Sequence, residues 1–208
     1  METLVQQQYD RLAKIYDQRW QFYVSNTLNF LIDWAEIRPK EMLLDVACGT
    51  GEFERLLIQR NPEQRIIGVD FSAQMLAIAH TKHKDAANLT FQLASASALP
   101  WSTPQFDAVV CANAFHYFDK PETVLAQFAQ VLNPGGRVII LDWCRDFWFC
   151  QVCDWVLGWL DPAHKRCYTE AELRGLLTQG GFRVVRSQRQ RFGWIWGLMV
   201  VEAWMGDE

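Results

Sequence analysis

Between residues 42 and 142 the sequence alternates short apolar runs with segments of helical periodicity, and no other feature constrains the fold as much. The apolar runs are Met42–Ala47, Arg65–Asp70, Leu89–Leu93, Phe106–Ala112 and Arg137–Asp142. Continuous apolar runs are typical of strands that are buried on both faces. Strands that alternate with helices form a parallel sheet with helices on both sides, so we expect an α/β fold.

The segments between these runs are expected to be helices. They are Glu52–Gln59, Ser72–Thr81 and Pro121–Leu132. Ser72 suits the N-cap position, because its hydroxyl can accept a hydrogen bond from a backbone N–H of the first turn. Pro121 suits a first turn, where the missing N–H has no intrahelical partner. The segment Asn133-Pro-Gly-Gly136 then predicts a turn.

Both ends of the chain add elements to this core. Apolar residues at helical spacing predict two helices before the first strand, which together form an N-terminal helical cap over residues 1–38; they are Val5, Tyr9, Leu12 and Tyr16, then Tyr23, Thr27, Phe30 and Trp34. The segment Thr169-Glu-Ala-Glu172 is typical of a capping box, and the helix it opens should stop at Gly180.

Two strands are expected after this last helix, at about residues 182–190 and 194–204, joined by a short turn near Gly193. A turn that short requires an antiparallel hairpin. With right-handed crossovers in the rest of the sheet, we predict a doubly wound seven-stranded sheet of order 3-2-1-4-5-7-6, in which only strand 7 is antiparallel. The whole chain, residues 1–208, is expected to form one domain.

A helical insertion is expected at residues 143–168, between the fifth strand and the capping box, with its helix ending near Asp161-Pro162. The insertion carries apolar residues at helical spacing, namely Trp148, Val152, Trp155, Val156 and Trp159. It leaves the carboxyl end of a strand, where doubly wound sheets bind their ligands. Two interpretations stay open: a lid with aromatic side chains around an apolar ligand, or an ordinary helix that buries these side chains on the sheet.

Charge and termini limit the partners. The formal net charge is −4, which argues against a nucleic-acid partner, because such binding needs a basic face. The first residues lack a secretory signal, and no run of 18 apolar residues predicts a membrane-spanning helix. We therefore expect a cytoplasmic protein without integral membrane association. The sequence leaves room for a peripheral membrane contact, and the oligomeric state stays open.

Six cysteines are expected to be reduced thiols in that compartment. Cys150 and Cys153 form a single C-x-x-C pair without a second pair at zinc spacing, so no metal site is predicted. Four arginines lie on the penultimate strand and are expected mainly to guard a sheet edge, with an anionic partner or a membrane surface as the alternative. They are Arg183, Arg186, Arg189 and Arg191.

A glycine-rich turn follows the first strand and opens a helix, in the segment Leu43-Leu-Asp-Val-Ala-Cys-Gly-Thr-Gly51. Glycines there let the backbone approach a ligand. The second strand ends at Asp70, and a carboxylate at this position can accept hydrogen bonds from a ribose diol. The two features predict a site for an adenosine-containing cofactor.

Two cofactor classes compete for this site. A dinucleotide fingerprint places a third glycine where this chain has Glu54, and a carboxylate there would repel a pyrophosphate. S-adenosylmethionine carries no phosphate, and its cationic amino group suits Asp45 just before the turn. The comparison favours S-adenosylmethionine.

Four motifs in order resemble the class I S-adenosylmethionine-dependent methyltransferases, over roughly residues 40–142. They are Asp45-Val-Ala-Cys-Gly-Thr-Gly51, Gly68-Val-Asp-Phe-Ser-Ala-Gln-Met75, Ala98-Leu-Pro-Trp101 followed by Gln105-Phe-Asp-Ala-Val-Val110, and Leu132-Asn-Pro-Gly-Gly-Arg137. The segment from Tyr9 to Asp17 is also similar to the opening of the quinone-type C-methyltransferases. The resemblance implies a Rossmann-like fold and methylation of a small, apolar or aromatic molecule.

The resemblance also implies site residues. The turn at Ala47, Cys48, Gly49 and Gly51 would hold the methionine portion of the cofactor, with Asp45 fixing the turn or the amine. Asp70 would bind the ribose, Phe71 and Met75 would pack on the adenine, and Ala96 would offer it a backbone N–H. The family usually has an aspartate where this chain has Ser95, a weaker acceptor for the adenine amino group. Asn113 would line the cofactor.

Catalysis and acceptor binding are assigned to residues near the strand ends. His116 follows the fourth strand and is the candidate general base, with a packing role as the alternative. Tyr9, Tyr16, Trp148 and Trp155 are the candidate acceptor-binding residues. The competing hypothesis for the whole chain is a protein that binds the cofactor without methyl transfer, in a regulatory or assembly role.

Overall fold

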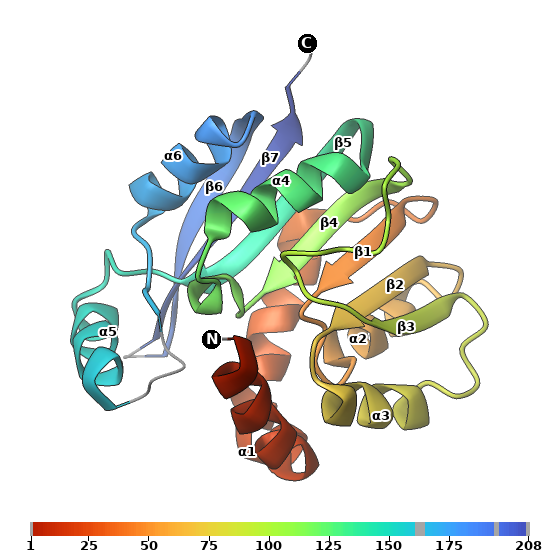
Figure 1. Cartoon of the computed structure of the whole chain (residues 1–208), viewed down its shortest axis with the longest axis horizontal. Coiled ribbons are helices and arrows are strands. Elements are labelled where there is room, and N and C mark those ends of the chain that lie inside the picture. Colours follow the sequence, from red (N-terminus) through yellow and green to blue (C-terminus); the bar gives the residue numbers. More distant parts are fainter. Residues whose placement is uncertain (1, 161–164, 194–195, 207–208) are drawn as a thin grey trace.

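The computed structural model describes residues 2–160, 165–193 and 196–206. It contains one seven-stranded sheet of order β3-β2-β1-β4-β5-β7-β6 (Figure 1). The strands are β1 (Met42–Val46), β2 (Arg65–Asp70), β3 (Leu89–Leu93), β4 (Phe106–Ala112), β5 (Leu132–Trp143), β6 (Phe182–Phe192) and β7 (Trp196–Met205). The helices are α1 (Glu2–Ala35), α2 (Glu52–Arg60), α3 (Ala73–Lys82), α4 (Pro121–Val131), α5 (Trp148–Leu160) and α6 (Glu170–Gln179), with a 3₁₀ turn, η1 (Phe115–Tyr117).

The topology confirms the predicted order and the direction of every strand. β1 pairs in parallel with β2 and β4, and the pairs β2–β3 and β4–β5 are also parallel. β7 runs antiparallel to both β5 and β6. The carboxyl ends of β1, β2, β4 and β5 therefore meet at one edge of the sheet, where a doubly wound fold binds its ligands.

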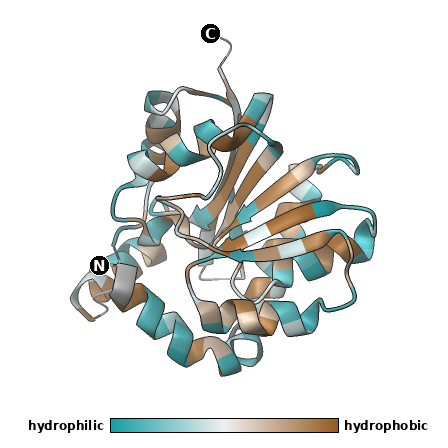
Figure 2. Cartoon of the chain, turned by 45° about the vertical axis from the view of Figure 1, so that its right-hand side comes forward, coloured by the Kyte–Doolittle hydropathy of each residue, from teal (hydrophilic) through white to brown (hydrophobic). Residues whose placement is uncertain are grey.

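Two hydrophobic cores cover the two faces of the sheet. Alternate residues of each central strand point to opposite faces: Leu43 packs in the core with α1 and α2, and Leu44 in the core with α4 and α6. Figure 2 shows mainly hydrophobic strands in the sheet and helices of mixed hydropathy around it. Strands buried on both faces produce the continuous apolar runs of the sequence.

The turn expected at Asn133–Gly136 forms within the first part of β5, a correction to the predicted start of this strand at Arg137. The pairing of β4 with β5 shifts register here, so that Phe106 lies opposite Leu132 and Ala108 opposite Arg137. Gly135 has a φ of +72°, which only glycine adopts without strain. The glycines were thus correctly predicted to bend the chain. Residues before and after this bend both pair with β4, so the strand begins earlier than predicted.

The two predicted N-terminal helices are one continuous helix of 34 residues, α1, so the prediction of a break was wrong. The apolar positions of the two segments continue through Trp20 at steps of three and four residues, and no proline or glycine lies between them. Nothing local ends the first segment, because helices stop at residues that cannot continue the hydrogen-bond ladder. The carboxyl-terminal half packs in the core through Leu28, Leu31, Ile32 and Ala35.

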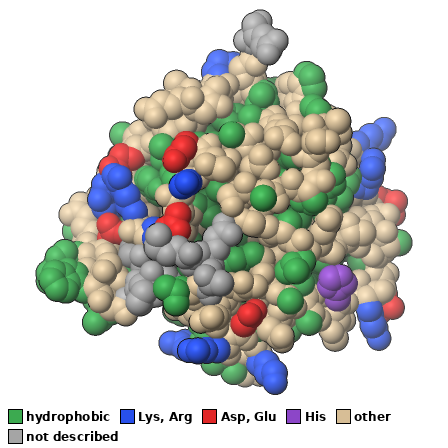
Figure 3. Space-filling view, viewed as in Figure 1, with side chains coloured by type: hydrophobic (Ala, Val, Ile, Leu, Met, Phe, Trp, Pro, Cys, Tyr) green, Lys and Arg blue, Asp and Glu red, His purple; other side chains and the backbone are tan. Residues whose placement is uncertain are grey.

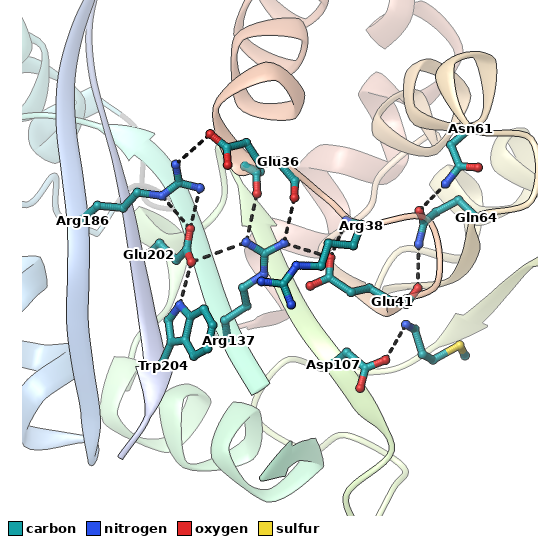
Figure 4. Close-up of polar contacts among 12 residues, drawn as sticks. Glu36, Arg38, Glu41, Asn61, Gln64, Asp107, Arg137, Arg186, Glu202 and Trp204 are labelled. Carbon is teal, nitrogen blue, oxygen red and sulfur yellow. Dashed lines mark hydrogen bonds and ion pairs between the residues drawn. The ribbon is translucent and has the colours of Figure 1, made fainter. Parts of the chain in front are cut away.

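A buried arginine holds the carboxyl end of α1 to the sheet (Figure 4). Arg137 of β5 donates to the carbonyl oxygens of Ala35 at 3.0 Å and Glu36 at 3.4 Å. It also pairs with Glu41 at 2.9 Å and Glu202 at 3.4 Å. A cation at a helix carboxyl end satisfies free carbonyls and the helix dipole. This network lies at the amino end of β5, away from the ligand edge.

The C-terminal elements follow the prediction where they are described. Thr169 and Glu172 form the capping box of α6, and the helix ends at Gly180. The expected helix end at Asp161-Pro162 and the first residue of the last predicted strand, Trp194, lie outside the described residues. No helix in the described part of the chain is long and apolar enough to cross a membrane.

Candidate active site

The glycine turn begins where β1 ends. Ala47, Gly49 and Gly51 all have positive φ, at +63°, +56° and +76°. A Cβ on Gly49 would meet no atom within 4 Å, because the turn faces open space there. A Cβ on Gly51 would lie 3.0 Å from His83 and Phe91, so this glycine permits close packing behind the turn. The turn is therefore a backbone wall without side chains at its most exposed point.

Asp70 at the end of β2 holds this turn in place. Its Oδ2 accepts a hydrogen bond from the backbone N–H of Gly49, and its Oδ1 accepts one from that of Ser72, both at 2.8 Å. Burial raises the pKa of Asp70 to about 6, although these backbone donors act in the opposite direction. Each carboxylate oxygen keeps further acceptor capacity toward a ligand.

A cavity of about 370 Å³ lies against the turn and Asp70. Its wall contains eight of the eleven predicted cofactor residues: Ala47, Gly49, Asp70, Phe71, Met75, Ser95, Ala96 and Asn113. Asp45, Cys48 and Gly51 are not part of the wall. Pockets of a few hundred cubic ångström that combine apolar walls with a few polar groups are usual sites for small ligands.

Ser95 lies in the wall of this cavity rather than pointing only to solvent. Its hydroxyl is 2.8 Å from that of Ser97 and accepts a hydrogen bond from the Ser97 backbone N–H at 3.2 Å. The hydroxyl is thus partly engaged within its own turn. A ligand amino group here would meet a neutral acceptor in place of the carboxylate that the family usually has.

The position of Glu54 in the structure contradicts the expectation that its carboxylate would repel a pyrophosphate in the cofactor site. Its side chain is fully buried and does not line the cavity. A Cβ on Gly68 would lie 2.6 Å from the Glu54 Oε1, so the carboxyl occupies the space that the strand glycine leaves free. Burial raises the pKa of Glu54 to about 7, and burial with the adjacent Glu54 raises the pKa of Asp45. Two neighbouring buried carboxyl groups repel each other when both are ionised, which favours a protonated form of the pair.

Glu54→Gln is expected to flatten the pH dependence of stability. The folded-state pKa of about 7 exceeds the unfolded value of 4.5, so the wild type loses stability as pH rises through this window. The glutamine variant should therefore gain roughly 1–3 kcal/mol relative to wild type between about pH 5 and pH 8. Urea unfolding at both pH values measures this, with Glu63→Gln as an exposed control. A stability difference that does not change with pH would contradict the raised pKa of Glu54.

A second cavity, of about 720 Å³, adjoins the first. Tyr9, Tyr16, Asn113 and Tyr117 line both cavities. The remaining wall of the second cavity combines aromatic side chains, namely Trp20, Tyr23, His116 and Trp143, with aliphatic, amide and basic ones. The two predicted acceptor residues on α1, Tyr9 and Tyr16, thus stand at the junction of the cavities.

His116 in the second cavity forms a buried pair with Asp142. Its Nδ1 lies 2.6 Å from the Asp142 Oδ1, and its backbone N–H donates to the Oδ2 at 2.7 Å. The imidazole also stacks on Trp143, with ring centroids 5.6 Å apart. A carboxylate on one ring nitrogen sets the tautomer and orientation, and it stabilises the ring when the other nitrogen takes a proton. The geometry therefore suits a general base.

A chain of hydrogen bonds supports the floor of the second cavity. Trp143 Nε1 donates to the hydroxyl of Tyr23, which donates to Asn113 Oδ1, both at 2.8 Å. Asn113 has a φ of +56°, a conformation that asparagine tolerates better than most residues. Burial raises the pKa of Tyr23 and of Tyr9, so these phenols stay protonated hydrogen-bond donors.

The amino-terminal half of α1 covers the first cavity through polar contacts. Gln6 donates to the carbonyl oxygen of Phe71 at 2.9 Å, and Asp10 accepts from the hydroxyl of Ser72. Asp17 accepts from the hydroxyl of Thr50 at 2.6 Å and pairs with Lys82 at 2.9 Å. The helix is thus bonded to the glycine turn and to the segment after β2, which both border the cavity.

Helix α5 does not place its predicted acceptor residues in either cavity. Trp148 and Trp155 are 66% and 68% exposed, and neither lines a cavity; Leu157 is the residue of α5 that does. The interpretation of these tryptophans as core residues was wrong, because Cys150 is the buried residue of this helix. The C-x-x-C cysteines, like the other four, are free thiols.

Sequence reasoning missed several residues of the second cavity. Asp142, Tyr23, Trp143 and Tyr117 were not assigned to a site, although all lie in its wall or pair with a residue that does. One signal was present: Asp142 is a carboxylate at the end of an otherwise apolar strand, and buried charges are normally paired. Tyr23 had been predicted only as part of the apolar face of a helix.

Comparison with known proteins finds that part of the chain is similar to methyltransferases. Residues 43–136 match the family model described as a methyltransferase domain. The demethylmenaquinone methyltransferase of Thermus thermophilus is 38% identical over 112 residues, which are 53% of this chain and 51% of the relative. The chain thus spans about half the length of this relative. The 2-phytyl-1,4-naphtoquinone methyltransferase of Thermosynechococcus vestitus is 27% identical, over 96% of this chain and 97% of the relative.

A solved complex that contains a Haloferax volcanii methyltransferase activator and a methyltransferase includes a chain of the same fold. Its TM-score is 0.86 at 18% sequence identity, and the match covers 98% of each chain. At this identity the likeness shows the fold alone.

Proposed function

We propose that this chain is a class I S-adenosylmethionine-dependent methyltransferase and that it methylates a small, apolar or aromatic molecule. One observation carries the proposal: two cavities meet at Tyr9, Tyr16, Asn113 and Tyr117, one built on the glycine turn and Asp70, the other on His116. A group-transfer enzyme needs two ligand sites that share a border, since the donor and acceptor atoms must touch.

The first cavity fits the cofactor. The turn at Gly49 offers backbone without a side chain toward the methionine portion, and Ala47 lines the same cavity. Asp70 is placed to accept from the ribose hydroxyls, and Phe71 and Met75 supply apolar surface for the adenine. Ser95 and Ala96 lie on the same wall and would contact the edge of the adenine. Asp45 acts indirectly, beneath the turn and against Glu54.

The acceptor is proposed to be a reduced quinone nucleus. Relatives are named for demethylmenaquinone and for 2-phytyl-1,4-naphtoquinone, both flat aromatic molecules with apolar tails. The second cavity suits such a ring, because its wall carries Tyr9, Trp20, Tyr117 and Trp143. Aromatic walls stack on flat rings and exclude water, and the tyrosine hydroxyls provide donors for the ring oxygens.

The chemistry follows from these positions. The cofactor supplies an electrophilic methyl group on a sulfonium. The side chains that border both cavities would align the acceptor atom with that methyl group. Methyl transfer is accelerated when the two atoms are close, aligned and shielded from water. As the new carbon–methyl bond forms, the acceptor must lose a proton from the attacked atom. The imidazole of His116 would take this proton on Nε2, while Asp142 holds Nδ1.

Mass spectrometry with a methyl-deuterated cofactor tests the proposal. The protein is incubated with this cofactor and with a reduced 2-polyprenyl-1,4-naphthoquinone, and the product should gain one trideuteromethyl group. An extract screened in the same way covers other acceptors. Cofactor binding without transfer to any acceptor would favour the competing role of a regulatory or assembly protein and overturn the assignment.

Asp70→Asn is expected to weaken cofactor binding by about 1.5–3 kcal/mol, the range for hydrogen bonds to a charged acceptor. Ser95→Ala, which removes at most one neutral hydrogen bond, should cost less, about 0.5–1.5 kcal/mol. Asparagine keeps the size of the side chain that supports Gly49 and Ser72. Calorimetric titration measures both affinities. A larger loss for the serine variant would show that the adenosine lies elsewhere.

A further inference from the structure

The outer face of α5 is apolar and carries no charge. Its members, named here the tryptophan face, are Trp148, Val152, Trp155, Trp159 and Leu160, and Trp159 is 80% exposed. The other exposed residues of this helix, Gln151 and Gly158, are uncharged. The acidic residue of α5, Asp154, turns inward and accepts from the backbone N–H of Cys167 at 2.6 Å. Three exposed tryptophans on one short helix are far more than a solvated surface usually carries.

Helix α1 carries a second exposed stripe, which is both apolar and basic. Leu4, Ile15 and Phe22 are exposed at intervals of 11 and 7 residues, so they share one side of the helix, and Phe22 is 86% exposed. Arg11, Lys14 and Arg19 lie along the same side. These six residues are named here the basic stripe.

The acidic and basic side chains of α1 are separated. Asp10 and Asp17 are bonded to Ser72, Thr50 and Lys82 on the protein side. Within the described residues, Arg11, Lys14 and Arg19 form no ion pair, and the guanidinium of Arg19 lies over the ring of Trp20 at 5.5 Å. The cations of this helix are therefore left for an external anion.

The basic stripe borders the second cavity, and the helix that carries the tryptophan face contributes one residue to its wall. Leu4, Arg11 and Arg19 of the basic stripe line it from α1, and Leu157 lines it from α5. Figure 3 shows hydrophobic side chains gathered at the left edge, over α5, and Lys and Arg side chains along the lower edge, over α1. The cavity thus lies along the basic stripe of α1 and reaches α5 at Leu157.

We propose that the tryptophan face and the basic stripe dock this protein on the surface of an anionic lipid bilayer. Tryptophan prefers the interface between water and acyl chains, and exposed Leu, Ile and Phe side chains insert beside it. Arg and Lys near an anionic leaflet are each attracted by about 1 kcal/mol. Because the net charge of the chain is −4, this attraction is local to α1 and orients the molecule.

The basic stripe explains a membrane contact better than the arginines of β6, because three of these four already have partners. Arg186 pairs with Glu202 at 2.8 Å, Arg189 pairs with Glu170 at 3.2 Å, and Arg191 lies over the ring of Phe147. A docked molecule would open its second cavity toward the bilayer. The value of this orientation rests on the proposed function, because it would let an apolar acceptor reach the cavity from the bilayer without crossing water. The docking itself does not depend on the proposed function.

Vesicle sedimentation tests the docking without any activity measurement. The purified chain is mixed with vesicles of phosphatidylcholine alone or of phosphatidylcholine and phosphatidylglycerol in equal parts. Wild type should sediment with the anionic vesicles and be released by high salt. Arg11→Gln and Lys14→Gln should each weaken binding about fivefold, and the Trp155→Ser/Trp159→Ser variant at least tenfold. Lys84→Gln, an exposed lysine between α3 and β3, is the matched control and should bind as wild type.

Thermal midpoints of all variants should match the wild type, because the substituted side chains are exposed. Light scattering of the same samples identifies other occupants. A wild-type dimer that the Trp155→Ser/Trp159→Ser variant converts to a monomer, without vesicle binding, would make the face a contact between copies and overturn the proposal. Absence of binding to anionic vesicles, or equal binding by wild type and all variants, would overturn it too. Loss of vesicle binding by Lys14→Gln, whose side chain lines neither cavity, with methyl transfer intact would separate this proposal from the proposed function.

Discussion

His116→Gln is expected to lower kcat for methyl transfer about a hundred- to ten-thousand-fold, the usual contribution of a general base. The imidazole lines the second cavity, and Asp142 contacts its Nδ1 at 2.6 Å. Glutamine can still donate a hydrogen bond to Asp142, so the buried carboxylate keeps a partner. It has no ring nitrogen to accept a proton from the acceptor. Single-turnover transfer of a deuterated methyl group at saturating cofactor measures the effect.

Two companion measurements separate catalysis from packing. Cofactor affinity should stay within about twofold of the wild type, because His116 does not line the first cavity. Asp142→Asn should also lower kcat, since an amide stabilises the protonated imidazole less well. The thermal midpoint of each variant reports on folding. A His116→Gln enzyme that turns over at the wild-type rate would assign the imidazole to packing alone.

Arg137→Met is expected to cost about 3–5 kcal/mol of unfolding free energy, the usual effect of removing one partner from a buried ion pair. Glu41 and Glu202 would keep their charges without this cation, and the carbonyls of Ala35 and Glu36 would lose their donor. Because α1 covers both cavities, cofactor affinity should fall as well. Urea unfolding followed by circular dichroism gives the free energy.

Arg186→Met is the matched control for this network. Arg186 also pairs with Glu202, at 2.8 Å, but it is partly exposed and lies over Trp34. Its loss should cost about 1 kcal/mol or less, as for other solvent-accessible pairs. A triple variant that adds Glu41→Gln and Glu202→Gln to Arg137→Met should recover part of the lost stability, because it removes the unpaired charges. Equal costs for the two arginines would contradict the role given to burial.

Most strands could be predicted because burial on two faces leaves a strong local signal. Arg65–Asp70, Leu89–Leu93 and Phe106–Ala112 were predicted with the bounds that the structure has. The capping box at Thr169 and the N-cap at Ser72 were also correct, since both depend on contacts within one turn. The N-terminal helix was divided wrongly because the absence of a stop signal was given too little weight. Continuity of the apolar spacing through Trp20 would have predicted one helix.

Many of the predicted cavity residues follow strand ends. Ala47, Asp70 and Asn113 each come directly after or at the end of a strand, so the sheet order brings them to one cavity. The pairing of His116 with Asp142 depends on the neighbouring ends of β4 and β5. The two residues are far apart in the sequence, so no spacing pattern predicts their contact. Glu54 was wrongly predicted to face the cofactor. Its carboxyl group fills the space beside Gly68, and this glycine lies on a different element, so the sequence around Glu54 gives no sign of the contact. Trp148 and Trp155 show apolar spacing, which does not distinguish a pocket wall from a free surface.

Tyr9 and Tyr16 of α1 belong to the walls of both cavities, and this sharing couples the two ligands thermodynamically. A ligand that fixes these rings in one cavity also fixes part of the wall of the other. Linkage then requires reciprocity: the factor by which bound cofactor changes the affinity for the acceptor equals the factor by which bound acceptor changes the affinity for the cofactor. The shared wall on α1 would thereby make the occupancy of each cavity depend on the concentrations of both ligands.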